Sequence, residues 1–591
     1  MEKSIKVHVK DALQKLYNVD PDDLNIEIEK TREGFEGDFT LVVFPFLKYS
    51  KKAPEQTAKE IGAYLRSKMT EIASYNVIKG FLNLVMTQEY WIDILNYLIS
   101  TNFSFFKNTG KNLMIEFSSP NTNKPLHLGH IRNNLLGDSI SRLIAETGNN
   151  VIKVNLINDR GIHICKSMLA WQKWKKDLNP ENSGKKGDKL VGDFYVLFEN
   201  ENKKQIQELI DQGLTKEEAE NTPLMQEARE MLRKWESNDP EIMKIWEMMN
   251  SWVYAGFEKT YSDLGITFDK IYYESQTYLL GKEIVEKGLE KGIFYREADN
   301  SVWIDLTNEG LDKKLLLRSD GTTVYMTQDL GTAVQRFQEF NPDLIIYVVG
   351  NEQEYHFKVL KKIIEKLYPE YSDRIFHLSY GMVELPEGKM KSREGKVVDA
   401  DDLVEEMIQT ATEIANENGK VNNLPEEEKS RILKIIALGA LKYYILKVDP
   451  KKQIVFNPAE SIDFAGNTGP FIQYTHARIC SILRKADEMK IKFKGKINSE
   501  TEIVTKEINL ISLLSEYESV VAKAAKNFDP GSIANYVYNL AKEFNQYYHD
   551  YTILKEQDPK VLQLRLMLCK QIAATIRKSM NVLGIEVPEV M

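Results

Sequence analysis

The stretch that decides the fold runs from residue 112 to residue 157 and reads NLMIEFSSPNTNKPLHLGHIRNNLLGDSISRLIAETGNNVIKVNLI. Its first part, Asn112–Phe117, is a short apolar run that predicts a strand. Helical spacing predicts a helix from about His130 to Glu146, which Gly148 is placed to end. A second strand is predicted at Val151–Ile157. A strand, a helix and a strand in this order form the building block of a parallel sheet.

The chain on either side of this unit divides into further parts. Before it, helical spacing at Ile5–Tyr17 and Pro54–Met69 and strand-like runs at Phe39–Leu47 and Asn76–Met86 predict a small α+β domain. We assign this N-terminal domain to residues 1–105.

The central part is assigned to residues 106–460. A buried strand is predicted at Leu344–Val349, closed by Gly350. A highly charged region near residues 171–260 predicts a helical insertion into the sheet. Apolar residues recur at helical spacing in the last part, residues 461–591, which predicts an all-helical bundle.

Composition excludes several classes of protein. The 591 residues are 42% hydrophobic and 28% charged, which is typical of globular proteins. No apolar run is long enough for a membrane helix, and the start shows no secretory core, so we expect a cytoplasmic protein without a membrane. Cys165, Cys480 and Cys569 are far apart, which argues against a disulfide framework or a cysteine zinc site. The net charge of −9 argues weakly against a nucleic-acid partner.

The first chemical motif is His127-Leu128-Gly129-His130, at the start of the predicted helix. Free backbone N–H groups and the helix dipole make such a site suitable for phosphate, and Gly129 lets a ligand approach the backbone. Taken alone, these four residues are better explained by a capped helix with two surface histidines. A metal site would need a third ligand, and the sequence places none nearby.

The second motif is the cationic, glycine-bounded segment Lys389-Met390-Lys391-Ser392-Arg393-Glu394-Gly395. A loop of this composition can grip a polyphosphate, although alone it is more often a solvated basic turn.

Together and in this order, the two motifs resemble the HIGH and KMSKS elements of class I aminoacyl-tRNA synthetases. Further motifs narrow the resemblance to the arginyl-tRNA synthetase family, and it covers essentially the whole chain. These motifs are Glu116-Phe117-Ser118-Ser119-Pro120-Asn121, Tyr325-Met326-Thr327-Gln328-Asp329-Leu330, Tyr347-Val348-Val349-Gly350-Asn351-Glu352-Gln353 and Gly469-Pro470-Phe471-Ile472-Gln473-Tyr474-Thr475-His476-Ala477-Arg478.

The resemblance implies a fold and a reaction. The fold is a Rossmann-like α/β catalytic domain, a doubly wound parallel sheet with ATP at the carboxyl ends of its strands near the topological switch point. In the reaction, the carboxylate of L-arginine attacks the α-phosphate of ATP and expels pyrophosphate, and the arginyl group then passes to the 3′-terminal adenosine of tRNA(Arg). Catalysis of this kind needs positioning and stabilisation of phosphate charge, without a covalent nucleophile.

For ATP, the resemblance implies His127, Gly129, His130, Lys389 and Ser392. The fourth position of the KMSKS element is Ser392 where the family pattern has a second lysine. Many arginyl enzymes show this loss and carry a lysine just before the HIGH element, where Lys124 stands here. We expect Lys124 and Lys389 together to bind the phosphates of ATP, and we expect His127 and His130 to be the other catalytic residues. The roles of Lys391 and Arg393 stay open.

For arginine, the resemblance implies five residues. We expect Asp329 to meet the guanidinium group and Tyr325, four residues earlier on a helix, to pack beside it. Glu116, Asn121 and Gln353 are expected to fix the α-amino end and the backbone of the substrate.

The implied partners are tRNA(Arg), L-arginine and ATP, with Mg²⁺ as part of the substrate complex. No protein-bound metal or organic cofactor is expected, and we expect a monomer. The N-terminal domain is expected to contact the tRNA elbow and the C-terminal domain the anticodon, where Gln473, Tyr474 and Arg478 are the candidate contacts.

Two alternatives remain at this point. A smaller HIGH-type nucleotidylyltransferase would share the phosphate site but lack the long helical C-terminal part. A non-catalytic RNA-binding paralogue would be expected to lose His127, His130 or Lys389, and all three are present. We also expect arginine activation to require tRNA, because the KMSKS element is degenerate.

Overall fold

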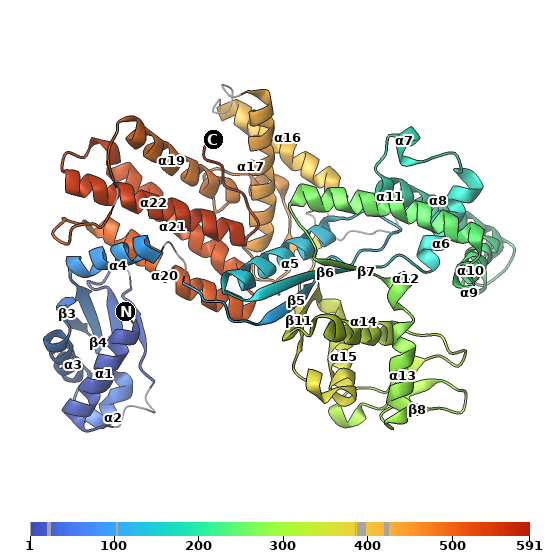
Figure 1. Ribbon diagram of the computed structural model, residues 1–591, viewed down its shortest axis with the longest axis horizontal. Helices are drawn as coiled ribbons and strands as arrows, with labels where there is room; N and C mark the ends of the chain where they lie inside the picture. Colours follow the sequence, from blue (N-terminus) through green and yellow to red (C-terminus); the bar gives the residue numbers. More distant parts are fainter. Residues whose placement is uncertain are drawn as a thin grey trace. The chain divides into compact units, whose positions relative to one another are not determined.

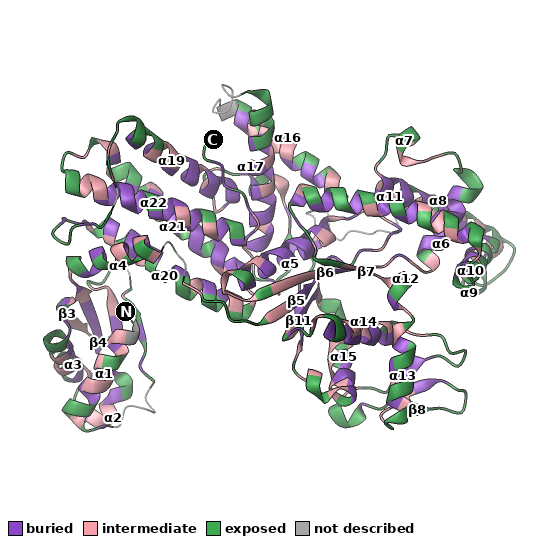
Figure 2. Cartoon of the chain, viewed as in Figure 1, coloured by how far each residue is buried: buried purple, intermediate pink, exposed green. Residues whose placement is uncertain are grey.

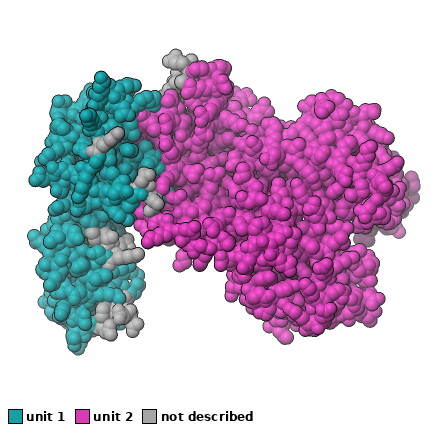
Figure 3. All heavy atoms as spheres, viewed as in Figure 1, with its two compact units in different colours: residues 1–104, 481–517, 542–574 teal, residues 105–480, 518–541, 575–591 magenta. Residues whose placement is uncertain are grey.

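The computed structural model describes residues 2–19, 25–32, 34–101, 105–384, 386, 398–418, 425–493 and 495–591. It divides into two compact units, shown in Figure 3. Unit 1 comprises residues 1–104, 481–517 and 542–574, and unit 2 comprises residues 105–480, 518–541 and 575–591.

The N-terminal part of unit 1 is built on a four-stranded sheet in the order β1-β2-β4-β3, in which every pair is antiparallel. Apolar residues of the sheet and of the adjoining helices, such as Leu41, Leu82 and Ile61, are buried, and Figure 2 colours the buried residues purple. The elements are α1 (Glu2–Tyr17), β1 (Ile28–Lys30), β2 (Phe39–Val42), η1 (Phe44–Phe46), α2 (Leu47–Ser50), α3 (Pro54–Lys68), β3 (Ile72–Ile78), β4 (Phe81–Met86) and α4 (Gln88–Thr101).

The structure corrects two predicted strands in this part. The run Asn76–Met86 is a hairpin, because Lys79 and Gly80 have φ angles of 49° and 81° and reverse the chain between β3 and β4. Two consecutive positive φ angles are typical of the tight turns that join antiparallel strands. The run Phe39–Leu47 is extended only as far as Val42, after which Pro45 sits in the 3-10 turn η1.

The central sheet of unit 2 has five parallel strands in the order β12-β11-β5-β6-β7. They are β5 (Asn112–Glu116), β6 (Asn150–Ile157), β7 (Lys270–Tyr273), β11 (Leu344–Gly350) and β12 (Ile375–Tyr380). The chain moves outward from β5 to β6 and β7, and later from β11 to β12 on the other side. The topological switch point therefore lies between β5 and β11, and the doubly wound parallel sheet is confirmed.

The helix α5 (Leu128–Glu146) connects β5 to β6, as the sequence predicts. Gly148, with φ of 81°, follows its end. Asn133 of α5 donates to the carbonyl of Val348 at 2.7 Å and to the Tyr380 hydroxyl at 3.1 Å, so it ties the helix to β11 and β12.

The charged region predicted as an insertion is helical. Figure 1 shows α8 and α11 running side by side, and α6 packs on α8. The helices are α6 (Ile162–Trp174), α7 (Pro180–Ser183), α8 (Gly187–Asp211), α9 (Lys216–Ala219), α10 (Pro223–Glu236) and α11 (Pro240–Leu264).

The rest of the central part consists of helices and short strands, several of which are labelled in Figure 1. A three-stranded antiparallel sheet has the order β10-β9-β8. The elements are α12 (Glu274–Thr277), α13 (Leu280–Glu290), β8 (Tyr295–Arg296), β9 (Val302–Ile304), η2 (Thr307–Glu309), β10 (Lys314–Leu317), α14 (Tyr325–Phe340), η3 (Asn351–Gln353), α15 (Glu354–Leu367), η4 (Pro369–Tyr371), β13 (Val383–Glu384), α16 (Ala400–Asn418), α17 (Glu426–Leu446) and β14 (Ile454–Val455).

The C-terminal part is helical, as predicted. Its elements are α18 (Pro458–Ser461), α19 (Gly469–Glu488), α20 (Thr505–Asn527), α21 (Pro530–Asp550), η6 (Ile553–Lys555) and α22 (Pro559–Val582). Within unit 1, the buried Glu507 accepts from Tyr547 and from Arg565, each at 2.9 Å. In the parts of the chain that the structure describes, none of the helices has both the length and the apolar character needed to cross a bilayer.

Candidate active site

The loop that leaves the carboxyl end of β5 makes a sharp turn at two serines. Ser118 and Ser119 have φ angles of 79° and 45°, which side-chain-bearing residues adopt only when their surroundings hold them there. The Ser118 N–H donates to Asn133 Oδ1 at 2.5 Å, and the Ser119 N–H donates to Asn155 Oδ1 at 3.0 Å. Both amide side chains are buried, so the path of the loop toward α5 is fixed.

The two histidines of the HIGH element cap the helix that this loop enters. His127 Nδ1 accepts from the Gly129 N–H at 3.1 Å, and His130 Nδ1 accepts from the His127 N–H at 3.2 Å. A ring nitrogen that accepts carries no proton, so in each neutral ring the proton is on Nε2. A side chain at Gly129 would meet His127 Cε1 at 2.9 Å, so glycine is required there.

Electrostatics keep both rings neutral. Burial, with a smaller contribution from Lys124, lowers the pKa of His127 to about 3. Burial also holds the pKa of His130 well below its ordinary value, with help from His127 and Lys124. At neutral pH each ring can therefore donate one hydrogen bond from Nε2 without carrying charge.

Of these residues, His127 lines a cavity of about 500 Å³, which we call the histidine pocket, whereas Gly129 and His130 are not among its lining residues. Lys124 lies in its wall, and burial lowers the pKa of its amine. Among the described residues, no hydrogen-bond or ion-pair partner contacts this amine. The lining residues are Asn121, Asn123, Lys124, Pro125, Leu126, His127, His163, Lys189, Gly192, Asp193, Tyr195, Val196, Tyr325, Asp399 and Asp402.

Lys389 and Ser392 lie outside the described residues, but the chain on both sides of their segment contacts the region around α5. After the segment, the Leu128 N–H donates to the Val398 carbonyl at 3.2 Å, and the Ala400 N–H donates to the Leu126 carbonyl at 2.9 Å. Before the segment, Arg132 of α5 donates to the Met382 carbonyl at 2.9 Å.

A second cavity of about 640 Å³, the glutamate pocket, shares Asn121, His163 and Tyr325 with the first. Tyr325, the first residue of α14, is 73% exposed. The other lining residues are Asn158, Arg160, Gly161, Ile162, Ile164, Leu232, Glu236, Glu274, Tyr278, Leu279, Lys282, Arg318, Thr322, Thr323, Val324 and Gln328.

Glu274 is a residue of this pocket that the sequence analysis missed. It directly follows β7, at the carboxyl edge of the sheet where ligands bind in this class of fold. Burial raises the pKa of Glu274 to about 7, Arg160 opposes this, and Asp159 and Asp329 raise it further. No donor in the described part of the chain is hydrogen-bonded to its carboxylate. The signal that could have found it was a single glutamate after the strand Lys270–Tyr273.

Three of the residues that we expect to bind arginine line neither of the two pockets. Glu116, at the end of β5, forms an ion pair with the buried Arg336 of α14 and accepts from Ser119 Oγ at 3.3 Å. Asp329 is paired with His356, whose Nε2 lies 2.6 Å from Asp329 Oδ2. Gln353 is exposed at the end of the turn that follows β11. Asp329 therefore lies beside the site, whereas the carboxylate of Glu116 is already paired inside the protein with Arg336.

The candidate RNA contacts differ in how far their side chains are buried. Gln473 is 0% exposed, and its Nε2 donates to the carbonyls of Ile435 at 3.0 Å and Glu586 at 2.8 Å. Its side chain cannot contact tRNA in this conformation, because it holds the C-terminal segment instead. Tyr474 and Arg478 are half-buried, with the guanidinium 4.7 Å from the centre of the ring.

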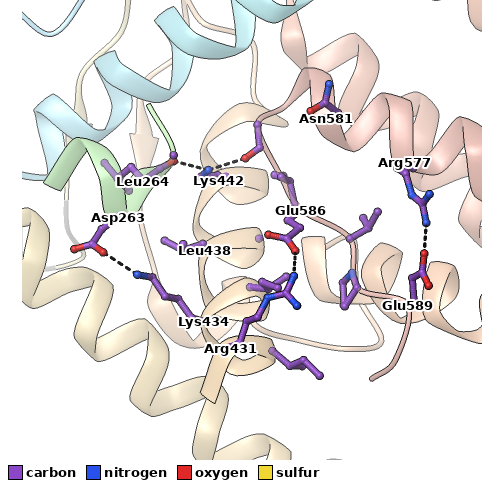
Figure 4. Close-up of a pocket in the computed structure, with 18 of the residues that line it drawn as sticks. Asp263, Leu264, Arg431, Lys434, Leu438, Lys442, Arg577, Asn581, Glu586 and Glu589 are labelled. Carbon is purple, nitrogen blue, oxygen red and sulfur yellow. Dashed lines mark hydrogen bonds and ion pairs between the residues drawn. The ribbon is translucent and has the colours of Figure 1, made fainter. Parts of the chain in front are cut away.

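A larger cavity, of about 940 Å³, lies beside the C-terminal segment of unit 2 (Figure 4). Its cations already have partners. Arg431 is paired with Glu586 at 2.8 Å, Arg577 with Glu589 at 2.8 Å and Lys434 with Asp263 at 2.7 Å, and Lys442 donates to the carbonyls of Leu264 at 2.7 Å and Gly584 at 2.6 Å. The remaining cation, Arg142, is paired with Asp138 at 2.6 Å. This cavity contains none of the predicted ATP or arginine residues.

No three histidine, cysteine, aspartate or glutamate side chains among the described residues are arranged so that they could hold a metal ion.

Family models match three consecutive parts of the chain. Residues 94–457 match the class I tRNA synthetases (R), catalytic domain. Residues 472–591 match the DALR anticodon binding domain, and residues 3–86 match the arginyl tRNA synthetase N terminal domain.

Close relatives match the chain over its length. An arginine–tRNA ligase of Parabacteroides distasonis is 57% identical over 98% of each chain. The same enzyme of Bacteroides thetaiotaomicron is 56% identical over 100% of each chain. The arginyl-tRNA synthetase structure of Thermus thermophilus aligns with a TM-score of 0.76 at 23% identity, over 100% of both chains, and shows the same fold. The chain therefore belongs to the arginyl-tRNA synthetases, within the class I tRNA synthetases.

Proposed function

We propose that this chain activates L-arginine with ATP and transfers the arginyl group to tRNA(Arg), and that the two adjoining pockets divide the substrates. The single observation that carries this division is the wall that the pockets share at Asn121, His163 and Tyr325. The neutral His127 and Lys124 lie on one side, and Glu274, whose carboxylate has no hydrogen-bond donor among the described residues, lies on the other. The carboxylate of arginine and the α-phosphate of ATP would meet at this wall.

The histidine pocket is the proposed ATP site. His127 and His130 donate from Nε2 to phosphate oxygens, and Lys124 supplies a positive charge. Because the rings are already neutral and fixed as helix caps, they need no rearrangement when charge develops on the phosphates. Preorganised donors of this kind contribute about 2.7–4 kcal/mol each to transition-state stabilisation. Lys389 and Ser392 are assigned to the same phosphates by their motif, with Mg²⁺ arriving as part of the ATP complex.

The glutamate pocket is the proposed arginine site. The guanidinium group is planar, always charged and has five donors, so two carboxylates at different angles suit it. Asp329 and Glu274 are the proposed pair, with Tyr325 packed beside the side chain of the substrate. Asn121, which lines both pockets, is proposed to hold the polar end of the substrate at the shared wall.

The remaining arginine residues have smaller proposed roles. Glu116 is proposed to act through Ser119 and Arg336, which fix the loop after β5, rather than as a free carboxylate. Gln353 keeps its proposed role at the α-amino end of the substrate.

The proposed tRNA contacts lie outside the catalytic part. Residues 1–105 are assigned to the tRNA elbow, residues 106–460 to catalysis and residues 461–591 to the anticodon, with Tyr474 and Arg478 as candidate contacts. Stacking on bases and a guanidinium over a ring are both common in single-stranded RNA recognition. We further infer a monomer that works in the cytoplasm.

The experiment that tests this function is pyrophosphate–ATP exchange with each of the twenty amino acids, with and without total tRNA. Exchange with arginine alone, and only when tRNA is present, is the expected result. Exchange with arginine in both conditions would support the proposed enzyme activity and contradict the tRNA requirement. No exchange with cognate tRNA present would favour a non-catalytic RNA-binding protein.

A further inference from the structure

Lys189, on the insertion helix α8, lies close to the loop that carries Lys124. The helix passes so near this loop that a Cβ atom added at Gly192 would lie 2.8 Å from Pro125 Cδ and 3.6 Å from Lys124 Cα. Lys189 is three residues before Gly192 and therefore lies on the same helix face. Both residues line the histidine pocket, so α8 brings a second lysine beside Lys124.

The partner of Lys189 is an exposed carboxylate. Its Nζ lies 2.7 Å from Asp402 Oδ1 and 3.0 Å from Oδ2, and the two side chains are 42% and 58% exposed. Exposed ion pairs of this kind contribute little net free energy, because water solvates both groups nearly as well. The lysine can therefore leave Asp402 for a more highly charged partner at small cost.

The backbones that carry Lys189 and Asp402 are held by a partly buried network of polar side chains. Lys186 donates to Thr260 Oγ1 at 2.5 Å, lies 3.2 Å from Asp188 Oδ2 and is paired with Asp401. Asp188 and Thr260 are buried. The network joins α8, α11 and α16, whereas the flexible stem of Lys189 stays at the rim of the pocket.

We infer that Lys189 is a further ATP-binding residue, whose ammonium group moves from Asp402 to the β- and γ-phosphates when nucleotide enters the histidine pocket. This inference rests on the proposed assignment of ATP to that pocket. It gives the pocket a second lysine in a chain whose KMSKS element has serine at position 392. Without Lys189, Lys124 would be the only described lysine of the pocket, and a triphosphate bound there would face the carboxylates of Asp399 and Asp402.

The test is equilibrium binding of ATP and of AMP to the full chain and its variants. Lys189→Met removes the charge and keeps a good helix former, and Lys189→Arg keeps the charge. Lys204→Met is the matched control, because Lys204 lies on the same helix in an ion pair of 2.6 Å with Glu201 and lines none of the described cavities. Thermal unfolding of every variant checks the fold.

We expect Lys189→Met to weaken ATP binding roughly ten- to hundredfold, the range for a lost charge-assisted hydrogen bond. AMP binding, which lacks the outer phosphates, should change less than twofold, and Lys189→Arg should restore most of the ATP affinity. Asp402→Asn should strengthen ATP binding, because it removes a competing carboxylate.

Three outcomes would overturn the inference. They are equal ATP affinity in Lys189→Met and Lys204→Met, equal losses of ATP and AMP affinity in Lys189→Met, and equal weakening of ATP binding by Lys189→Met and Asp402→Asn. The last result would show that the ion pair merely supports the fold. Because binding is measured without amino acid or tRNA, each outcome is independent of whether arginine is the substrate.

Discussion

Replacement of Glu274 by glutamine tests the proposed arginine pocket most sharply. The substitution keeps the shape of the side chain and removes its charge. Burial and two neighbouring carboxylates raise the pKa of Glu274 to about 7 from an ordinary value of 4.5. That difference corresponds to about 3 kcal/mol of unfavourable free energy in charging the group. A guanidinium group bound beside the charged carboxylate offsets this cost and lowers the pKa of Glu274.

The expected loss of arginine affinity follows from the strength of one hydrogen bond between charged groups. A hydrogen bond between charged groups contributes about 1.5–3 kcal/mol, so Glu274→Gln should raise the KM for arginine roughly ten- to hundredfold at pH 8. The KM for ATP should change less than twofold. The matched control is Glu290→Gln, which removes one carboxylate at the exposed end of α13 and should leave both KM values unchanged.

The pH dependence gives a second, independent readout. Guanidinium binding favours the charged carboxylate, so the wild-type KM for arginine should rise as pH falls through 7, by up to about tenfold per unit. Glu274→Gln should remove this dependence, because it has no proton to lose. The assay is arginylation of tRNA at saturating ATP from pH 6 to pH 8.5. A KM for arginine close to wild type at pH 8, or an unchanged pH profile in the variant, would refute the role of Glu274.

Three further predictions concern residues chosen from the sequence. Asp329→Ala should raise the KM for arginine at least tenfold while ATP binding stays intact, because loss of the carboxylate leaves a guanidinium donor unpaired. A collapse of ATP binding would show that the arginine pocket is wrongly assigned. Lys124→Ala should slow adenylate formation in single-turnover assays without weakening tRNA binding, and an unchanged rate would remove Lys124 from the phosphate site. Gln473→Leu should lower the free energy of unfolding by about 2 kcal/mol through two unpaired carbonyls. A loss of tRNA affinity with unchanged stability would instead make Gln473 an RNA contact.

The parallel sheet could be predicted from the sequence because its central unit is locally consistent. Residues 112–157 combine an apolar run, helical spacing and a terminating glycine, and each signal agrees with the structure. The hairpin within residues 72–86 was missed because apolar residues stand on both sides of its turn and read as one continuous strand. Only the positive φ angles of Lys79 and Gly80 reverse the chain, and a lysine does not signal such an angle.

The candidate site could be predicted less completely. Motif residues such as His127 and Lys124 lie in one pocket, because they share one short loop at the start of α5. Glu274 and Lys189 reach the pockets from α12 and α8, which are distant in the sequence and carry no motif. The burial of Gln473 could not be predicted, because a polar side chain in a motif gives no sign of its burial. Its role depends on the C-terminal segment, more than 100 residues later.

A crystal structure of the chain with L-arginine and a non-hydrolysable ATP analogue tests the division of substrates between the two pockets most directly. We expect the guanidinium group within hydrogen-bond distance of Asp329 and Glu274, and the triphosphate against His127, His130 and Lys124. The arginine carboxylate should lie next to the α-phosphate near Asn121. A guanidinium group outside the glutamate pocket, or a triphosphate that contacts neither histidine, would contradict the assignment.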